Sequence, residues 1–125
     1  MDDRRGAGPD PGVSIVLCTA PVDRAEWLAE RLLEGGLIAC ANLVGPVVSR
    51  YVWEGRLERA NEMLLVLKTR TDLVREMTER LVELHPYDVP EVLELPVSSG
   101  LEAYLSWVRT SCPAPSGGSV PPVGD

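Results

Sequence analysis

Two side chains in this sequence could bind a soft metal ion. Cys18 follows a short apolar run, and His85, the only histidine, stands directly before a proline. Copper-type ions favour thiolate and imidazole ligands. The pair could hold Cu(I) linearly, or hold an ion loosely with help from water or a carboxylate, whereas a closed zinc-type site would need four ligands. Cys18 and His85 are therefore the candidate metal ligands.

Each of these two residues also has a purely structural interpretation. Free cysteine is among the most frequently buried residue types, so Cys18 can instead be a small hydrophobic side chain at the end of a central strand. His85 can instead be an imidazole at a helix terminus that interacts favourably with the helix dipole. The sequence leaves both interpretations open.

The sequence contains no recognisable catalytic set. Its single histidine has no serine or acidic triad pattern beside it, and there is neither a phosphate-cradling glycine loop nor an H-E-x-x-H motif. We therefore predict that the protein is not an enzyme and uses no organic cofactor.

The charge and cysteine content limit the partners and the compartment. The 125 residues include 19 acidic residues against 12 lysines and arginines, a net charge of −7, and an acidic surface repels nucleic acid and anionic lipid headgroups. No apolar run approaches the roughly 20 residues that span a bilayer. The three cysteines are far apart and odd in number, unlike a disulfide framework. These features predict a cytoplasmic protein that binds neither nucleic acid nor membranes.

The chain divides into one domain and two terminal segments. Residues 1–12 and 113–125 consist mainly of proline, glycine, serine and charged residues, so ordering them would cost backbone entropy with little apolar burial in return. We predict that both are disordered tails and that residues 13–112 form a single domain.

Hydrophobic patterning predicts the elements of the first half of this domain. Residues 13–19 are apolar and β-branched, as in a central strand covered on both faces. A helix should follow, with a capping box that begins at Asp23 and a stop at Gly35-Gly36. Residues 47–53 and 63–69 should then form a long hairpin.

The second half continues the same alternation of strands and helices. The hairpin should bend at Gly45-Pro46, because proline cannot donate a ladder hydrogen bond. Thr71 should cap a second helix that ends at His85-Pro86. Residues 92–95 form a short strand, and Ser99 should begin a third helix.

The predicted order is therefore β-α-β-β-α-β-α. Such a pair of split β-α-β units gives an α+β, ferredoxin-like sandwich, with one antiparallel sheet covered by helices on one face, and here with an extra C-terminal helix. The uncovered face of the sheet would carry tyrosine, tryptophan, valine and leucine. An apolar face of that kind indicates a partner subunit.

Five motifs in this order along the domain resemble those of the CutA divalent-cation tolerance family. Each motif alone has low specificity, but together they cover nearly the whole domain. They are Cys18-Thr19-Ala20-Pro21; Ala39-Cys40-Ala41-Asn42; Tyr51, Trp53, Glu54 and Gly55 with Glu62 and Lys68-Thr69; His85-Pro86-Tyr87 with Pro90-Glu91; and Tyr104-Leu105 with Trp107.

The resemblance implies a homotrimer whose long hairpins join three sheets, similar in build to PII signalling proteins, which bind small ligands between subunits. It also implies a link to tolerance of copper and other divalent cations, without an established enzymatic activity. In such a trimer one set of residues would line an inter-subunit pocket: Trp53, Glu54, Lys68, Tyr87, Glu91, Tyr104 and Trp107. A lysine beside a glutamate on an aromatic wall could hold a small anion or a metal-bound ligand, and the alternative is an interfacial salt bridge with aromatic packing.

Two functions are consistent with this sequence. The first is a non-catalytic trimer that binds a copper-type divalent ion and acts in metal tolerance. The second is a PII-like signalling or adaptor trimer that binds a small molecule or a protein partner at its subunit interfaces.

Overall fold

The computed structural model describes residues 11–113, and the rest of the two segments predicted to be disordered lies outside the described residues. The described chain forms four strands, three α-helices and a short 3-10 turn, η2. In chain order these elements are β1 (Val13–Pro21), α1 (Ala25–Glu34), β2 (Cys40–Trp53), β3 (Arg56–Arg70), η2 (Thr71–Leu73), α2 (Val74–Leu84), β4 (Leu93–Pro96) and α3 (Glu102–Ser111).

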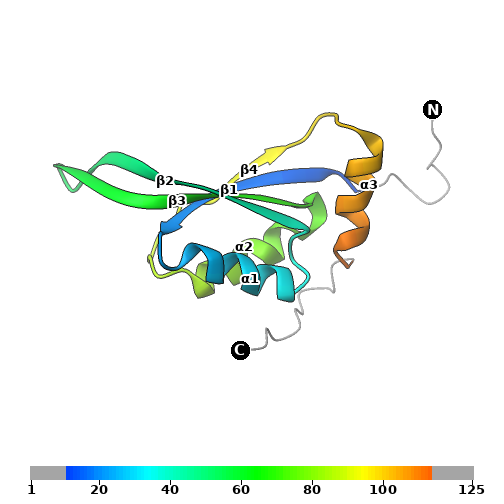
Figure 1. Cartoon of the computed structure of the whole chain (residues 1–125), viewed down its shortest axis with the longest axis horizontal. Coiled ribbons are helices and arrows are strands. Elements are labelled where there is room, and N and C mark those ends of the chain that lie inside the picture. Colours follow the sequence, from blue (N-terminus) through cyan, green and yellow to red (C-terminus); the bar gives the residue numbers. More distant parts are fainter. Residues whose placement is uncertain (1–10, 114–125) are drawn as a thin grey trace.

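The four strands form one antiparallel sheet in the spatial order β2-β3-β1-β4. Helices α1 and α2 cover one face of the sheet, and α3 lies at the end of the sheet that is opposite the β2–β3 turn (Figure 1). The predicted α+β class, with an antiparallel sheet and an additional C-terminal helix, is confirmed. Strand β4 is one residue later than predicted, because its ladder with β1 begins at the pair Leu17–Leu93.

Alternate residues of the two central strands build the core. Because successive side chains of a strand point to opposite faces, Val16, Cys18 and Ala20 of β1 all point toward the helices, where they are fully buried. They share one cluster with large buried side chains of β3, α1 and α2, namely Leu28, Leu32, Leu65, Leu67, Met77 and Leu81. Cys18 is therefore part of the hydrophobic core.

The glycine pair after α1 ends that helix as predicted. Gly36 has a positive φ of 72°, a conformation that costs glycine less than other residues. The amide of Leu37 donates to the carbonyl of Leu32, and the amide of Gly36 donates to that of Leu33. These two bonds are those of a Schellman motif, which turns the chain from α1 into β2.

The three predicted helix caps are wrong. Asp23, Thr71 and Ser99 each precede the true N-cap by one or two residues, and in the described residues 11–113 the N-cap residues of α1, α2 and α3 form no side-chain capping bond. Thr71 instead begins η2, and its hydroxyl lies 2.7 Å from that of Ser14 on β1. The residues at the N-cap positions of α1, α2 and α3 are Arg24, Leu73 and Leu101.

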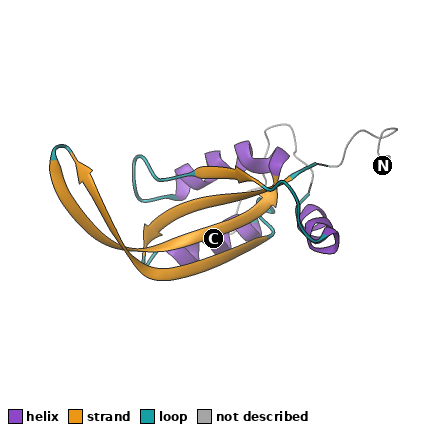
Figure 2. Cartoon of the chain, turned by 90° about the horizontal axis from the view of Figure 1, so that it is seen from above, coloured by secondary structure: helices purple, strands orange, loops and turns teal. Residues whose placement is uncertain are grey.

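The β2–β3 hairpin extends past the ends of α1 and α2 as a two-stranded arm, residues 48–61 (Figures 1 and 2). At its tip Glu54 and Gly55 form a two-residue turn, with φ values of 51° and 78°. Positive φ at both central positions is typical of the tight turns that match strand twist.

Both strands of this hairpin are longer than predicted. The ladder continues through the mostly polar residues 56–62, which lie between the two predicted strands. Polar side chains are compatible with a strand here because the arm exposes both of its faces. The predicted bend at Gly45-Pro46 is confirmed: the register between β2 and β3 shifts between Val44 and Val47.

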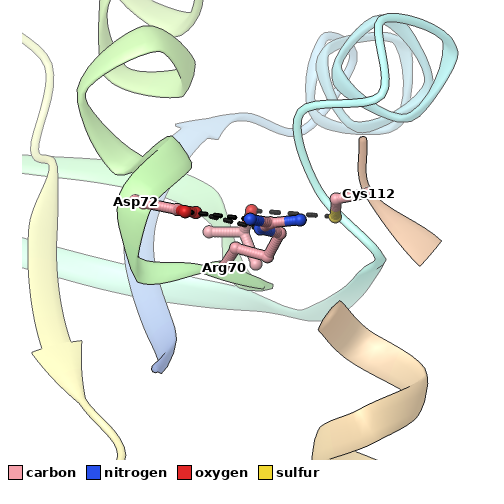
Figure 3. Close-up of polar contacts among 4 residues, drawn as sticks. Arg70, Asp72 and Cys112 are labelled. Carbon is pink, nitrogen blue, oxygen red and sulfur yellow. Dashed lines mark hydrogen bonds and ion pairs between the residues drawn. The ribbon is translucent and has the colours of Figure 1, made fainter. Parts of the chain in front are cut away.

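The last helix is attached to the sheet through its C-terminal end. Cys112 is buried, and its sulfur lies 3.9 Å from the hydroxyl of Thr69 on β3. Next to it the guanidinium of Arg70 donates two hydrogen bonds of 2.9 Å to Asp72 (Figure 3). Burial raises the pKa of the Cys112 thiol, so this cysteine contributes a neutral, packed side chain.

Candidate functional site

The two predicted metal ligands converge on one backbone atom at the end of β1. The Sγ of Cys18 donates to the carbonyl oxygen of Thr19 at 3.5 Å, and the Nε2 of His85 lies 2.9 Å from the same oxygen. Both side chains are buried. The fold therefore brings together two residues that are 67 positions apart in the sequence.

The hydrogen bonds of His85 fix its tautomer. The backbone amide of Tyr87 donates to Nδ1 at 3.1 Å, so Nδ1 is the unprotonated nitrogen. Nε2 then carries the proton and donates it to the carbonyl of Thr19. Both ring nitrogens are occupied in this way. The imidazole can offer a lone pair to a metal only if the amide of Tyr87 leaves Nδ1 or if Nε2 loses its proton.

The thiol of Cys18 is protonated at physiological pH. Burial, followed by the negative charges of Glu91 and Glu62, raises its pKa from 9.0 to about 12. A thiolate is the form that binds metals and attacks electrophiles. As long as Cys18 keeps this proton, its thiol is a packed core side chain and not a metal ligand.

The donor set at this point is small. Within residues 11–113 no group of three or more histidine, cysteine, aspartate or glutamate side chains is arranged to hold a metal ion. The pair of Cys18 and His85 fits at most a two-ligand soft ion. It does so only after the thiol has lost its proton and the imidazole has either lost the Nε2 proton or released Nδ1 from the amide of Tyr87.

A buried carboxylate lies beside this pair. Glu62 of β3 accepts a 2.6 Å hydrogen bond from the hydroxyl of Ser49 and a 2.8 Å bond from the hydroxyl of Tyr87. Burial and the bond to Glu62 raise the pKa of Tyr87 to about 12, so the phenol is a donor at physiological pH. The ring of Tyr87 packs against that of His85, with centroids 4.8 Å apart.

Sequence reasoning missed Ser49 altogether and gave Glu62 no role. The signal that could have found them is the position of Glu62 beside the apolar run of β3, where a charged side chain requires hydrogen-bond donors. Ser49 is one such donor, but only the register of β2 on β3 shows that it lies close enough.

The seven residues of the predicted inter-subunit pocket occupy three separate places in one chain. Trp53 and Glu54 are at the tip of the arm, and Tyr87 and Glu91 belong to the α2–β4 connection. Lys68, Tyr104 and Trp107 lie at the other end of the sheet, where α3 is (Figure 1). A single chain therefore does not bring all seven together.

The group beside α3 is a small polar cluster on the face of the sheet that α1 and α2 leave uncovered. The ammonium of Lys68 donates to the side chain of Asn42 and lies 3.8 Å from the sulfur of Cys40. Burial, then the proximity of Cys40, raises the pKa of Tyr104. Trp107 packs beside Tyr104 with ring centroids 5.6 Å apart. The ammonium and the aromatic pair thus both lie near Cys40, and a combination of this kind is suited to a small anion.

Comparisons with known proteins bear directly on this fold and its motifs. A family model described as "CutA1 divalent ion tolerance protein" matches residues 14–111. The chain belongs to the CutA1 family. A CutA1 crystal structure from Oryza sativa has a TM-score of 0.80 and 36% sequence identity, over 83% of this chain and 96% of that one.

Curated relatives agree with this assignment. The divalent-cation tolerance protein CutA of Pectobacterium atrosepticum is 44% identical over 98 residues, which are 78% of this chain and 89% of that protein. The chloroplastic protein CutA of Arabidopsis thaliana is 36% identical over 101 residues, or 81% of this chain, which spans 56% of the length of the plant protein.

The names of CutA1 relatives do not point to one compartment, because the Arabidopsis thaliana protein is called chloroplastic and the Archaeoglobus fulgidus protein is called periplasmic. In the part of the chain that the structure describes, no helix is long and apolar enough to cross a membrane. The cytoplasmic location of this chain stays a prediction.

Proposed function

We propose that this chain acts in divalent-cation tolerance as a non-catalytic, cytoplasmic homotrimer that binds a copper-type ion at Cys18 and His85. The role in tolerance is supported by the names of the relatives. The observation that carries the ion site is the convergence of both side chains on the carbonyl of Thr19. The order of elements and the strand order β2-β3-β1-β4 support the ferredoxin-like architecture.

The trimer is supported by the apolar side chains that one copy leaves exposed. Antiparallel partners on the uncovered face include the pairs Leu17–Leu93 and Ile15–Leu95, and both leucines of β4 are about half exposed. The arm adds aromatic side chains with similar exposure, Tyr51 and Trp53. Several large apolar side chains exposed on one side of the sheet in this way indicate a protein interface.

Ion binding at this site must displace a proton. The Cys18 pKa of about 12 means that a metal has to compete with the thiol proton, so affinity should rise with pH. Soft thiolate ligands select Cu(I) over hard cations. Two soft donors suit copper as Cu(I). The imidazole of His85 would supply the second donor after Nε2 loses its proton or after the amide of Tyr87 leaves Nδ1.

The test is a competition titration of the full-length chain with Cu(I) and a chelator of known affinity, at two pH values. We expect Cys18→Ser and His85→Ala each to weaken binding about tenfold or more, whereas Cys112→Ser leaves it unchanged, since Cys112 is buried beside Arg70 and Asp72, away from His85. Binding that is equal in wild type and Cys18→Ser would contradict the proposed ion site.

A second candidate, a PII-like trimer that binds a small anion between subunits, is favoured by the separation of the predicted pocket residues. The tip residues Trp53 and Glu54 and the cluster around Lys68 are at opposite ends of one chain, so a common pocket requires residues from different copies. A thermal-shift screen with nucleotides, carboxylates and metals tests this candidate, because a ligand that binds the folded state raises the melting temperature. Stabilisation by metals alone would count against it.

A further inference from the structure

One face of the arm carries two arginines directly opposite each other. Arg50 of β2 pairs with Arg59 of β3, and the neighbouring pair on the same face is Val52 with Leu57. Like charges directly opposite in an antiparallel pair are destabilising. Within residues 11–113 neither guanidinium takes part in an ion pair.

This surface is uncovered in a single chain. Val48, Val52 and Leu57 are 53%, 68% and 70% exposed, and the arm extends past α1 and α2 (Figures 1 and 2). The opposite face of the arm is a different surface, because it carries Ser49, which binds Glu62. We call the first surface the arginine face; it consists of Val48, Arg50, Val52, Leu57 and Arg59.

A surface of opposite character lies on the connection between α2 and β4. Val89 is 82% exposed, and the exposed carboxylates Asp88 and Glu91 stand on either side of it in the sequence. No ion pair among the described residues involves either carboxylate. We call these three residues the acidic loop. It presents an apolar side chain between two negative charges, whereas the arginine face presents apolar side chains beside two positive charges.

We propose that the arginine face of one copy docks on the acidic loop of a neighbouring copy, and that this contact sets the direction in which the subunits assemble. The proposal rests on the homotrimer of the proposed function. Within one chain the two surfaces are not ion-paired, and a contact between unlike patches on successive copies closes into a ring when the rotation between copies permits. Complementary charge of this kind selects the partner and fixes its register.

The test uses charge reversal in the full-length chain, with sedimentation over a dilution series as the readout. Arg50→Glu with Arg59→Glu, and separately Asp88→Arg with Glu91→Arg, should each raise the trimer dissociation constant roughly a hundredfold, because each places like charges together. The chain that combines all four substitutions should return to within about tenfold of wild type, because the attraction is restored with reversed sign. Arg75→Glu, a change on the exposed surface of α2, is the matched control and should leave the constant unchanged.

Four outcomes decide the proposal. Loss of trimer in both reversed variants with recovery in the combined chain supports it. Unchanged assembly in the reversed variants overturns it and leaves the homotrimer standing, and loss without recovery shows that the arginine face meets a different surface. If the wild-type chain is monomeric, both the homotrimer and this contact between copies are contradicted. Far-UV circular dichroism of each variant identifies any chain that has failed to fold. A double variant that fails to fold is replaced by its two single-substitution variants, each measured separately.

Discussion

The two faces of the sheet are built by the same alternation of residues and differ in what covers them. On the face toward α1 and α2, Cys18, Leu65 and Leu67 are fully buried. On the other face, Leu93 and Leu95 of β4 remain about half exposed. One chain thus completes only one of its two apolar layers. The covered face accounts for the fold of the single chain, and the uncovered face, together with the arm, accounts for assembly.

The largest predicted effect tests whether the covered face stabilises the single chain while the uncovered face stabilises the assembly. Leu67→Ala should lower the free energy of unfolding by about 2 to 5 kcal/mol, because it opens a cavity in the core, and the loss should be the same at every protein concentration. Leu95→Ala, the matched change on the uncovered face, should cost less, and its cost should depend on protein concentration. Urea unfolding of each variant at two protein concentrations measures both effects. If the two variants lose the same free energy of unfolding at both concentrations, the two faces do not differ in this way.

The next effect comes from the buried thiol of the covered face. The pKa of Cys18 is about 12 in the folded chain, against an ordinary value of 9.0. The folded state holds this proton more tightly than the unfolded state, so the contribution to stability is complete below pH 9 and is lost as the pH rises toward 12. The loss is at most about 4 kcal/mol. Between pH 7 and pH 11 the free energy of unfolding should fall less steeply in Cys18→Ala than in wild type. Parallel curves for the two chains would show that the folded state does not raise the pKa of this thiol.

The smallest effect concerns the hydrogen bonds that link the α2–β4 connection to the base of the arm. Tyr87→Phe removes the 2.8 Å bond to Glu62 and should lower the free energy of unfolding by about 1.5 to 3 kcal/mol, as expected for a bond to a charged group. Tyr51→Phe is the control, because the Tyr51 hydroxyl makes no hydrogen bond within residues 11–113, and it should change stability by less than about 0.5 kcal/mol. A larger loss in Tyr51→Phe would reverse the roles assigned to these two tyrosines.

The covered face was largely predictable from the sequence, because its signals are local. The apolar run that contains Cys18 predicts a buried strand, and Gly36 supplies the helix stop that the structure confirms. The helix caps were not predictable from side-chain type, because the side chains at the N-cap positions, such as that of Leu73, accept no hydrogen bond from the first turn. Thr71 had the right chemistry for a cap, but Ser14 on β1 binds its hydroxyl instead.

The candidate site was only partly predictable, because its geometry depends on contacts between distant segments. The sequence named Cys18 and His85, and the structure places both on the carbonyl of Thr19. It did not show that the amide of Tyr87 occupies the Nδ1 of His85. The register of β2 on β3 also brings Ser49 to Glu62 and Arg50 opposite Arg59. These pairs depend on the register of the whole hairpin, which the local sequence around each residue does not show.

The central claim is that the uncovered face and the arm are completed by other copies of the same chain. Sedimentation velocity on the full-length chain at micromolar concentration tests it most directly. We predict a single species with three times the chain mass of 13.6 kDa. A single species of 13.6 kDa at that concentration would contradict the claim.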